Sequence, residues 1–191
     1  MNTKLMKTTG LLAGLLASAS AAAHSGHHGG EWTSSLDAGL LHPLTGADHL
    51  LVLLVLGLWA CRGGGSLRPA GVFLGTLLAG SGLAVAGVSL PATETFVAAS
   101  VLLAGLMLAR QRRKELLASA AFGAMGLFHG QAHMTDVASQ AEPLLFALGL
   151  FTVSVAVIAA SHQVGIALRE SARSVAGYAT AAAGALMLLG A

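Results

Sequence analysis

Two histidines and one aspartate fall within eight residues near the start of a long apolar stretch: His42, Asp48 and His49. Ionisable side chains are costly inside a membrane and are candidates for function wherever they occur there. His42 and His49 are seven residues apart, about two turns, and so lie on one face of a regular helix. Pro43 cannot donate to the helical hydrogen bonds and Gly46 has no side chain, so we predict that the helix is bent or locally opened here.

A second pair of histidines lies near the end of another apolar stretch. His129 and His133 are four residues apart and stack on one face of a helix, the spacing used by paired metal ligands. Asp136 follows just beyond. When the two stretches cross a membrane in opposite directions, His42 and His133 both lie in its outer part. His49 and His129 then lie deeper, and the four imidazoles are expected to meet at one site or along a short ladder of sites.

The types of these side chains indicate a divalent transition metal. Imidazole nitrogen suits nickel, cobalt, copper and zinc, whereas carboxylate and water suit magnesium and calcium. The chain has one cysteine, Cys61, so no cysteine-based metal site is expected, which argues against copper(I). The candidate metal ligands are His42, Asp48, His49, His129 and His133, together with Asp136 and with His24 of the His-rich N-terminal stretch. These residue types do not separate nickel from cobalt or zinc.

The composition places the elements that carry these residues in a membrane. Of the 191 residues, 55% are hydrophobic and only 9% are charged, whereas about a quarter of the residues of soluble domains are charged. The mean hydropathy is +0.76. The net charge of +2 comes from basic residues that are grouped, which argues against a nucleic-acid-binding protein. We predict an all-α integral membrane protein.

Six apolar segments are predicted to form transmembrane helices, in a single domain over residues 24–191. They are Leu36–Ala60, Ala70–Val88, Ala92–Ala109, Leu116–His133, Pro143–Ala160 and Val175–Leu189. Short joins separate them, so no second domain is expected. Residues 1–23 have the form of a cleaved signal peptide, with a basic start, an apolar core too short to span a bilayer, and three alanines at the end.

Small residues spaced four apart predict close packing between some of these helices. Gly71 and Gly75 form one such pair, and Gly126 and Gly130 another, in a chain with 25 glycines. Membrane helices approach closely where small residues meet. Self-association of the chain into a homo-oligomer stays open.

The basic residues predict the orientation in the membrane. After the signal peptide the chain has eight Lys and Arg residues, all in the first, third and fifth joins, and none in the second or fourth. Cytoplasmic joins carry the excess of Lys and Arg in membrane proteins. These three joins are therefore expected in the cytoplasm, and both ends of the mature chain in the periplasm. The predicted location is the bacterial inner membrane, with several spans.

The two histidine segments resemble the signatures of a known family, the hydrogenase/urease accessory permeases (HupE/UreJ). The matching residues are His42-x5-Asp48-His49 followed by Gly57-Leu58-Trp59-Ala60, and Phe128-His129-Gly130-x-Ala132-His133. The cleaved signal, the six segments and the size match as well, so the resemblance covers essentially the whole chain. The family's second signature continues with Gly and then Glu, where this chain has Met134 and Asp136.

The resemblance implies uptake of nickel, or of cobalt as in some members, for the maturation of metalloenzymes. Ni²⁺ or Co²⁺ would then be the transported substrate of a permease that is not an enzyme, with an indirect link to hydrogenase or urease maturation proteins. We expect no tightly bound cofactor. The chain has no Gly-x-x-x-x-Gly-Lys sequence, so ATP hydrolysis is not expected. Inward movement of a divalent ion gains about 4.6 kcal/mol at ~100 mV, so passive uniport is the simplest mechanism, with proton coupling through Asp48 or a histidine left open.

Two other functions would use the same histidines. Paired histidines on two helices hold haem in membrane cytochromes, and the purified protein would then show a Soret band. Histidine ligands with Asp48 or Asp136 activating a water would instead make an intramembrane zinc hydrolase acting on a lipid or an amide. Transport is the function that we predict.

Overall fold

The computed structural model describes residues 35–61, 65–110, 114–135 and 142–190, and within these ranges it contains helices and no strand. The seven helices are α2 (Ser35–Thr45), α3 (Ala47–Ala60), α4 (Arg68–Val85), α5 (Thr93–Ala109), α6 (Glu115–Thr135), α7 (Pro143–Ala167) and α8 (Glu170–Gly190). The all-α prediction is confirmed for this part of the chain. The predicted signal peptide, His24 and Asp136 lie outside the described residues.

The first predicted segment is two helices rather than one. Helices α2 and α3 meet at Gly46 and are bent by 72°. Pro43 removes one hydrogen bond from the end of α2, and Gly46 has an extended conformation (φ −79°, ψ 109°), so the regular ladder is interrupted. Helix α3 then starts with Asp48 in its first turn, where the helix dipole favours a carboxylate. The bend predicted from Pro43 and Gly46 is confirmed.

Each of the other five predicted segments is a single helix whose ends differ from the prediction by a few residues. Pro69 and Pro143 stand in the first turns of α4 and α7, where a missing N–H costs no hydrogen bond. Helix α7 continues seven residues beyond the predicted end at Ala160, to Ala167, and includes His162. The prediction that this segment ends at Ala160 is therefore wrong, because the polar residues that follow the apolar run remain helical.

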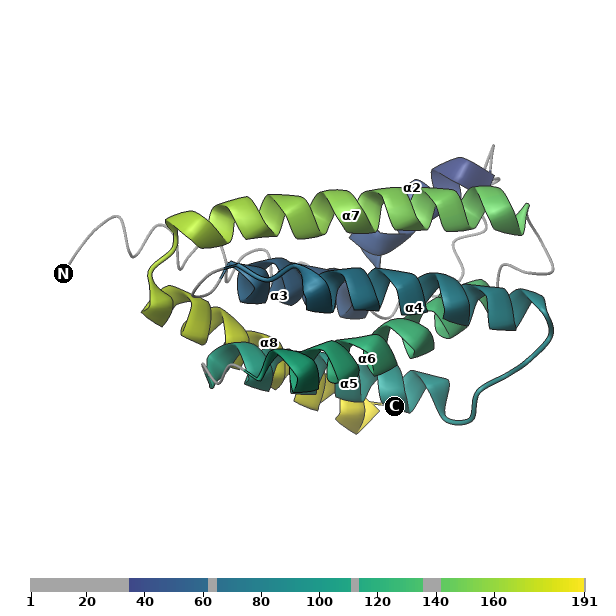
Figure 1. Cartoon of the computed structure of the whole chain (residues 1–191). Helices are drawn as coiled ribbons and strands as arrows, with labels where there is room; N and C mark the ends of the chain where they lie inside the picture. Colours follow the sequence, from purple (N-terminus) through teal and green to yellow (C-terminus); the bar gives the residue numbers. More distant parts are fainter. Residues whose placement is uncertain (1–34, 62–64, 111–113, 136–141, 191) are drawn as a thin grey trace.

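Most helices lie roughly along one common direction, with α3 surrounded by its neighbours (Figure 1). The closest pairs are α4 with α6 and α5 with α8, while α2 and α3 both pack on α7. Eleven of the fourteen residues of α3 are buried. A helix that is apolar on all sides and covered on all sides belongs to the core. Helix α3 therefore brings its first turn, with Asp48 and His49, into the interior of the bundle.

Two glycines set the close contact between α4 and α6. A Cβ atom at Gly126 or Gly130 would meet the backbone carbonyl oxygen of Phe73 or Leu77 on α4. The close approach predicted from this pair is confirmed. Gly71 and Gly75, by contrast, have no heavy atom within 4 Å of a Cβ position, so their face of α4 makes no close helix contact within the described chain.

The outer surface is rich in large apolar side chains. Leu144 is 80% exposed, and Leu186 and Leu189 are 69% and 86% exposed, as expected where lipid covers the protein. Helices α4, α7 and α8 are long and apolar enough to cross a membrane, and the bent α2–α3 pair adds a fourth candidate when it is taken as one broken span. Helix α5 is shorter. The described residues thus have three or four candidate spans, and the number six stays a prediction.

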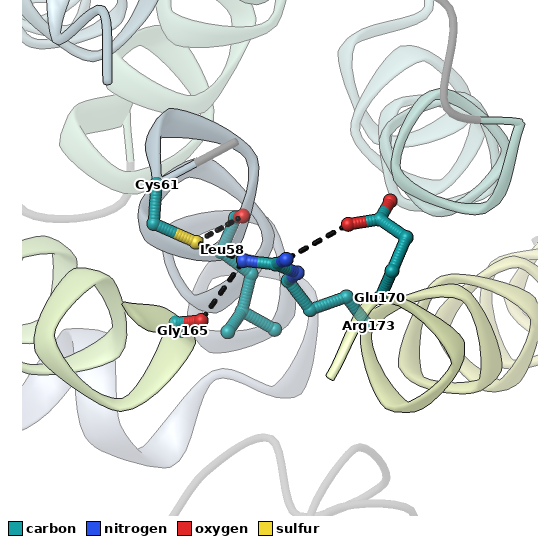
Figure 2. Close-up of polar contacts among 5 residues, drawn as sticks. All are labelled: Leu58, Cys61, Gly165, Glu170 and Arg173. Atoms are coloured by element: carbon teal, nitrogen blue, oxygen red, sulfur yellow. Dashed lines mark hydrogen bonds and ion pairs between the residues drawn. The ribbon is translucent and has the colours of Figure 1, made fainter. Parts of the chain in front are cut away.

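An arginine joins three helix ends (Figure 2). Arg173 of α8 donates to the carbonyl oxygen of Gly165 on α7 at 2.9 Å and to the sulfur of Cys61, just after α3, at 3.1 Å. It also forms an ion pair with Glu170, at 2.8 Å. The Cys61 thiol itself donates to the Leu58 carbonyl oxygen at 3.0 Å. Arg173 therefore fastens the end of α3 to the turn between α7 and α8.

The joins that carry basic residues lie at one end of the bundle. Cys61 and Ser66 belong to the first join. Cys61 is contacted by Arg173, near the start of α8 and next to the fifth join, and Ser66 donates to Glu115, next to the third join, at 2.8 Å. At the other end, the N–H of Glu142 donates to the hydroxyl of Ser35 at 2.8 Å. This grouping agrees with the pattern of charges in the sequence.

Candidate metal centre

Three histidines from three helices form a hydrogen-bonded row. Nε2 of His42, on α2, lies 2.6 Å from Nδ1 of His133, on α6. Nε2 of His133 lies 3.1 Å from Nδ1 of His49, on α3. Nε2 of His49 lies 3.2 Å from the hydroxyl oxygen of Ser154, on α7. His42 and His133 are half-buried and His49 and Ser154 are fully buried, so the row leads from the partly open side of the site into the core.

His129 stands beside this row, one turn before His133 on α6. Its ring centroid is 5.3 Å from that of His49 and 5.9 Å from that of His133. The side chain is fully buried, and Nδ1 donates to the carbonyl oxygen of Met125 at 2.9 Å. Nε2 has no hydrogen-bond partner. A buried polar atom without a partner costs free energy, so this nitrogen is the one most ready to accept a ligand.

Asp48 supplies a negative charge to the same place. It is half-buried in the first turn of α3 and close enough to His42, His129 and His133 to interact with them electrostatically. A carboxylate beside several imidazoles in a low-dielectric interior favours a bound cation.

The nitrogens of the row are directed at one another rather than at a common point. Among the described residues, no three His, Cys, Asp or Glu side chains are arranged to hold one metal ion as they stand. The reason is chemical, since each imidazole pair of the row has a proton between its two nitrogens. An ion would have to take the place of such a proton.

The structure brings five of the predicted site residues together: His42, Asp48, His49, His129 and His133. Their role as metal ligands stays a prediction, as do the roles of the two candidates outside the described residues. The two histidines of the first segment do not share a face of one straight helix, because the chain breaks between them. They approach the same partner from two helices.

Ser154 was not among the predicted site residues. This serine lies within an apolar run, 105 residues after His49. A serine in such a run ordinarily bonds back to its own helix, so no local spacing could have connected it with a histidine on another helix.

Known proteins match the chain over nearly all of its length. Residues 12–190 match the family described as HupE / UreJ protein. Protein HupE of Rhizobium leguminosarum bv. viciae is 33% identical over an alignment of 165 positions that covers 80% of this chain and 84% of that protein. No solved structure matches the chain. The family match includes both histidine segments, and the chain therefore belongs to the HupE/UreJ family.

Proposed function

We propose that this chain is a permease that takes up a divalent transition-metal cation across the bacterial inner membrane, with nickel as its substrate and cobalt as the alternative. The observation that carries the proposal is the meeting of four histidines from α2, α3 and α6 beside Asp48 in the interior of an apolar helical bundle. Ionisable residues in such a position mark ion pathways. The resemblance of both histidine segments to the accessory permeases supports nickel.

The spacing of the ring nitrogens suits an ion between the rings. At metal–nitrogen distances of about 2.0–2.1 Å, neighbouring ligand nitrogens lie about 2.9 to 3.3 Å apart, for angles from about 90° to 109°. Nε2 of His133 and Nδ1 of His49 are 3.1 Å apart. An ion that took the place of this proton would need His133 to change to the tautomer protonated on Nδ1, with Nε2 of His42 then accepting from it. The unpartnered Nε2 of His129, whose ring lies beside that of His49, would be the third donor. Asp48 would offset its charge.

The order of burial suggests a direction of movement. The ion would first meet the half-buried His42 and His133 and then the buried His49 and His129. The break at Gly46 lies beside this path, as expected for irregular backbone at membrane depth, which is tolerated where it borders protein or a polar cavity. Passive uniport driven by the membrane potential is the mechanism that we propose.

We further propose six spans, a cleaved signal peptide of residues 1–23 and periplasmic termini. The two helices that are not span candidates by length and composition still reach the lower limit of about 17 residues for a membrane span, at about 1.5 Å per residue. The 17 residues of α5 and the 21 residues of α6 give about 25 and 31 Å, against a hydrocarbon core of about 30 Å. The histidines and Gln131 make α6 less apolar than a typical span. The protein would serve hydrogenase or urease maturation indirectly, without catalysis or a tightly bound cofactor.

Uptake measurements test the proposal. Cells that produce the chain should accumulate radioactive nickel or cobalt faster than cells that produce an equal amount of the His49→Ala/His129→Ala double variant. Zinc uptake, measured in parallel, reports the selectivity. Equal accumulation of all three metals in both strains would reject transport by this site, and a Soret band in the purified protein would favour a cytochrome instead.

A further inference from the structure

We propose that Ser154, on α7, is a positioning residue of the metal site: its hydroxyl oxygen accepts the Nε2–H of His49 and thereby keeps Nδ1 of His49 unprotonated and turned toward the ion. The inference rests on the proposed transport function. Its physical basis is the direction of each hydrogen bond around His49. The histidine segments themselves do not contain this serine.

The direction at Ser154 follows from counting protons. The hydroxyl oxygen lies 2.7 Å from the carbonyl oxygen of Leu150 and 3.2 Å from Nε2 of His49. A carbonyl oxygen only accepts, so the single hydroxyl proton is donated to Leu150. The hydroxyl oxygen can then only accept from His49, and Nε2 of His49 must carry a proton. In a neutral imidazole the other nitrogen, Nδ1, is left with its lone pair.

The hydrogen bond at Ser154 also sets the direction of the other two hydrogen bonds of the row. Nδ1 of His49 accepts, so Nε2 of His133 donates to it across 3.1 Å. Nδ1 of His133 then accepts from Nε2 of His42 across 2.6 Å. Each step follows from the one before. The proton arrangement of all three rings is therefore determined at the inner end, by Ser154.

His129 is oriented in the same way by a different acceptor. Its Nδ1 donates to the Met125 carbonyl oxygen at 2.9 Å, which leaves the lone pair on the unpartnered Nε2. Metal-binding histidines commonly donate their second N–H to such an outer acceptor, and loss of that acceptor typically costs about 10- to 100-fold in metal affinity. Met125 would serve His129, and Ser154 would serve His49. Helix α7, which carries none of the proposed ligands, thus contributes to the site.

The test compares two buried serines of α7. Ser154→Ala removes the hydrogen-bond acceptor of His49. Ser161 lies two turns further along α7, and its hydroxyl donates to the Ile158 carbonyl oxygen at 3.1 Å, so Ser161→Ala removes an identical buried group that does not contact His49. We expect Ser154→Ala to raise the nickel concentration for half-maximal uptake by about 10-fold or more, with little change in the maximal rate. Ser161→Ala should stay within about twofold of the parent. An unchanged half-saturating concentration in Ser154→Ala, at normal amounts in the membrane, would overturn the inference.

A spectroscopic measurement separates this inference from the proposed function. In purified metal-free protein with ¹⁵N-labelled histidine rings, at about pH 8 where imidazole is neutral, NMR should show His49 protonated on Nε2 and His129 on Nδ1. The His49 signals, assigned from a His49→Gln variant, should change in Ser154→Ala and not in Ser161→Ala. A proton on Nδ1 of His49 in the parent would refute the role of Ser154. Absence of nickel uptake by the parent would instead count against the transport function alone.

Discussion

Replacing Gly130 with alanine is expected to force α6 away from α4. A Cβ atom at this position meets the carbonyl oxygen of Leu77 and comes within 2.8 Å of the backbone nitrogen of Ser81. Both atoms belong to the backbone of α4, which cannot rotate aside as a side chain can. Overpacking of this kind costs about 1–3 kcal/mol. The shift should also disturb the adjacent His129.

Gly75→Ala is a matched control on the partner helix. Its Cβ would have no heavy atom within 4 Å, and alanine is favoured over glycine inside a helix by about 0.5–1 kcal/mol. Both substitutions gain this helix preference, so the two variants should differ in free energy of unfolding by the overpacking cost alone, about 1–3 kcal/mol. Since about 1 kcal/mol changes the Tm of a domain of this size by about 2–4 °C, Gly130→Ala should melt several degrees below Gly75→Ala.

Thermal unfolding in detergent, followed by tryptophan fluorescence, measures this difference. Nickel uptake per molecule in the membrane should also be lower for Gly130→Ala than for Gly75→Ala. The reasoning would be refuted if Gly130→Ala were as stable as Gly75→Ala, because the contact between α4 and α6 would then not be the close backbone approach that the structure shows.

His49→Ala and His129→Ala should each lose most nickel uptake at normal protein amounts, whereas His162→Ala, further along α7, should behave as the parent; normal uptake by His49→Ala would disprove the site. A reporter active only in the cytoplasm and fused after Ala191 should give no signal, and a strong signal would reject a periplasmic C-terminus. Uptake at limiting nickel should fall as external pH drops from about 7 to 5, because only a neutral histidine nitrogen binds metal and the ordinary pKa is about 6.5. A higher nickel concentration should restore the uptake rate at low pH. Uptake that instead rises steadily toward pH 5, and that collapses with a protonophore at fixed membrane potential, would indicate proton coupling rather than uniport.

Local signals were sufficient to predict the helices and the break between α2 and α3. Apolar runs of about 20 residues are distinct from the polar joins. Pro43 and Gly46 interrupt the helical hydrogen bonds locally, independently of the packing around them. The meeting of the two histidine segments was also predicted, from their spacing and from opposite helix directions. These features depend only on neighbouring residues and on the depth that each helix position takes in the bilayer.

Features that depend on which helices pack together could not be predicted. Gly75 and Gly130 stand in the same small-residue spacing, yet only Gly130 faces another backbone. Ser154 contacts His49 because α3 packs against α7, and no pattern in the sequence predicts which two helices pack together. The end of α7 was misplaced because hydropathy marks where lipid contact ends, whereas the helix itself extends past that point through His162.

The packing of α2 and α3 on α7 has a consequence for biosynthesis. Residues 35–60 leave the ribosome long before residues 143–167, which later cover them. In the proposed topology, Asp48 and His49 would until then lie in the bilayer without the serine hydroxyl that His49 contacts in the finished protein, a state that is costly in hydrocarbon. A chain that stalls before α7 should therefore be recognisable to membrane proteases as incomplete. When α7 inserts, it covers α2 and α3 and brings Ser154 to His49. A chain that escapes proteolysis is therefore expected to be one in which the surroundings of the histidines are complete.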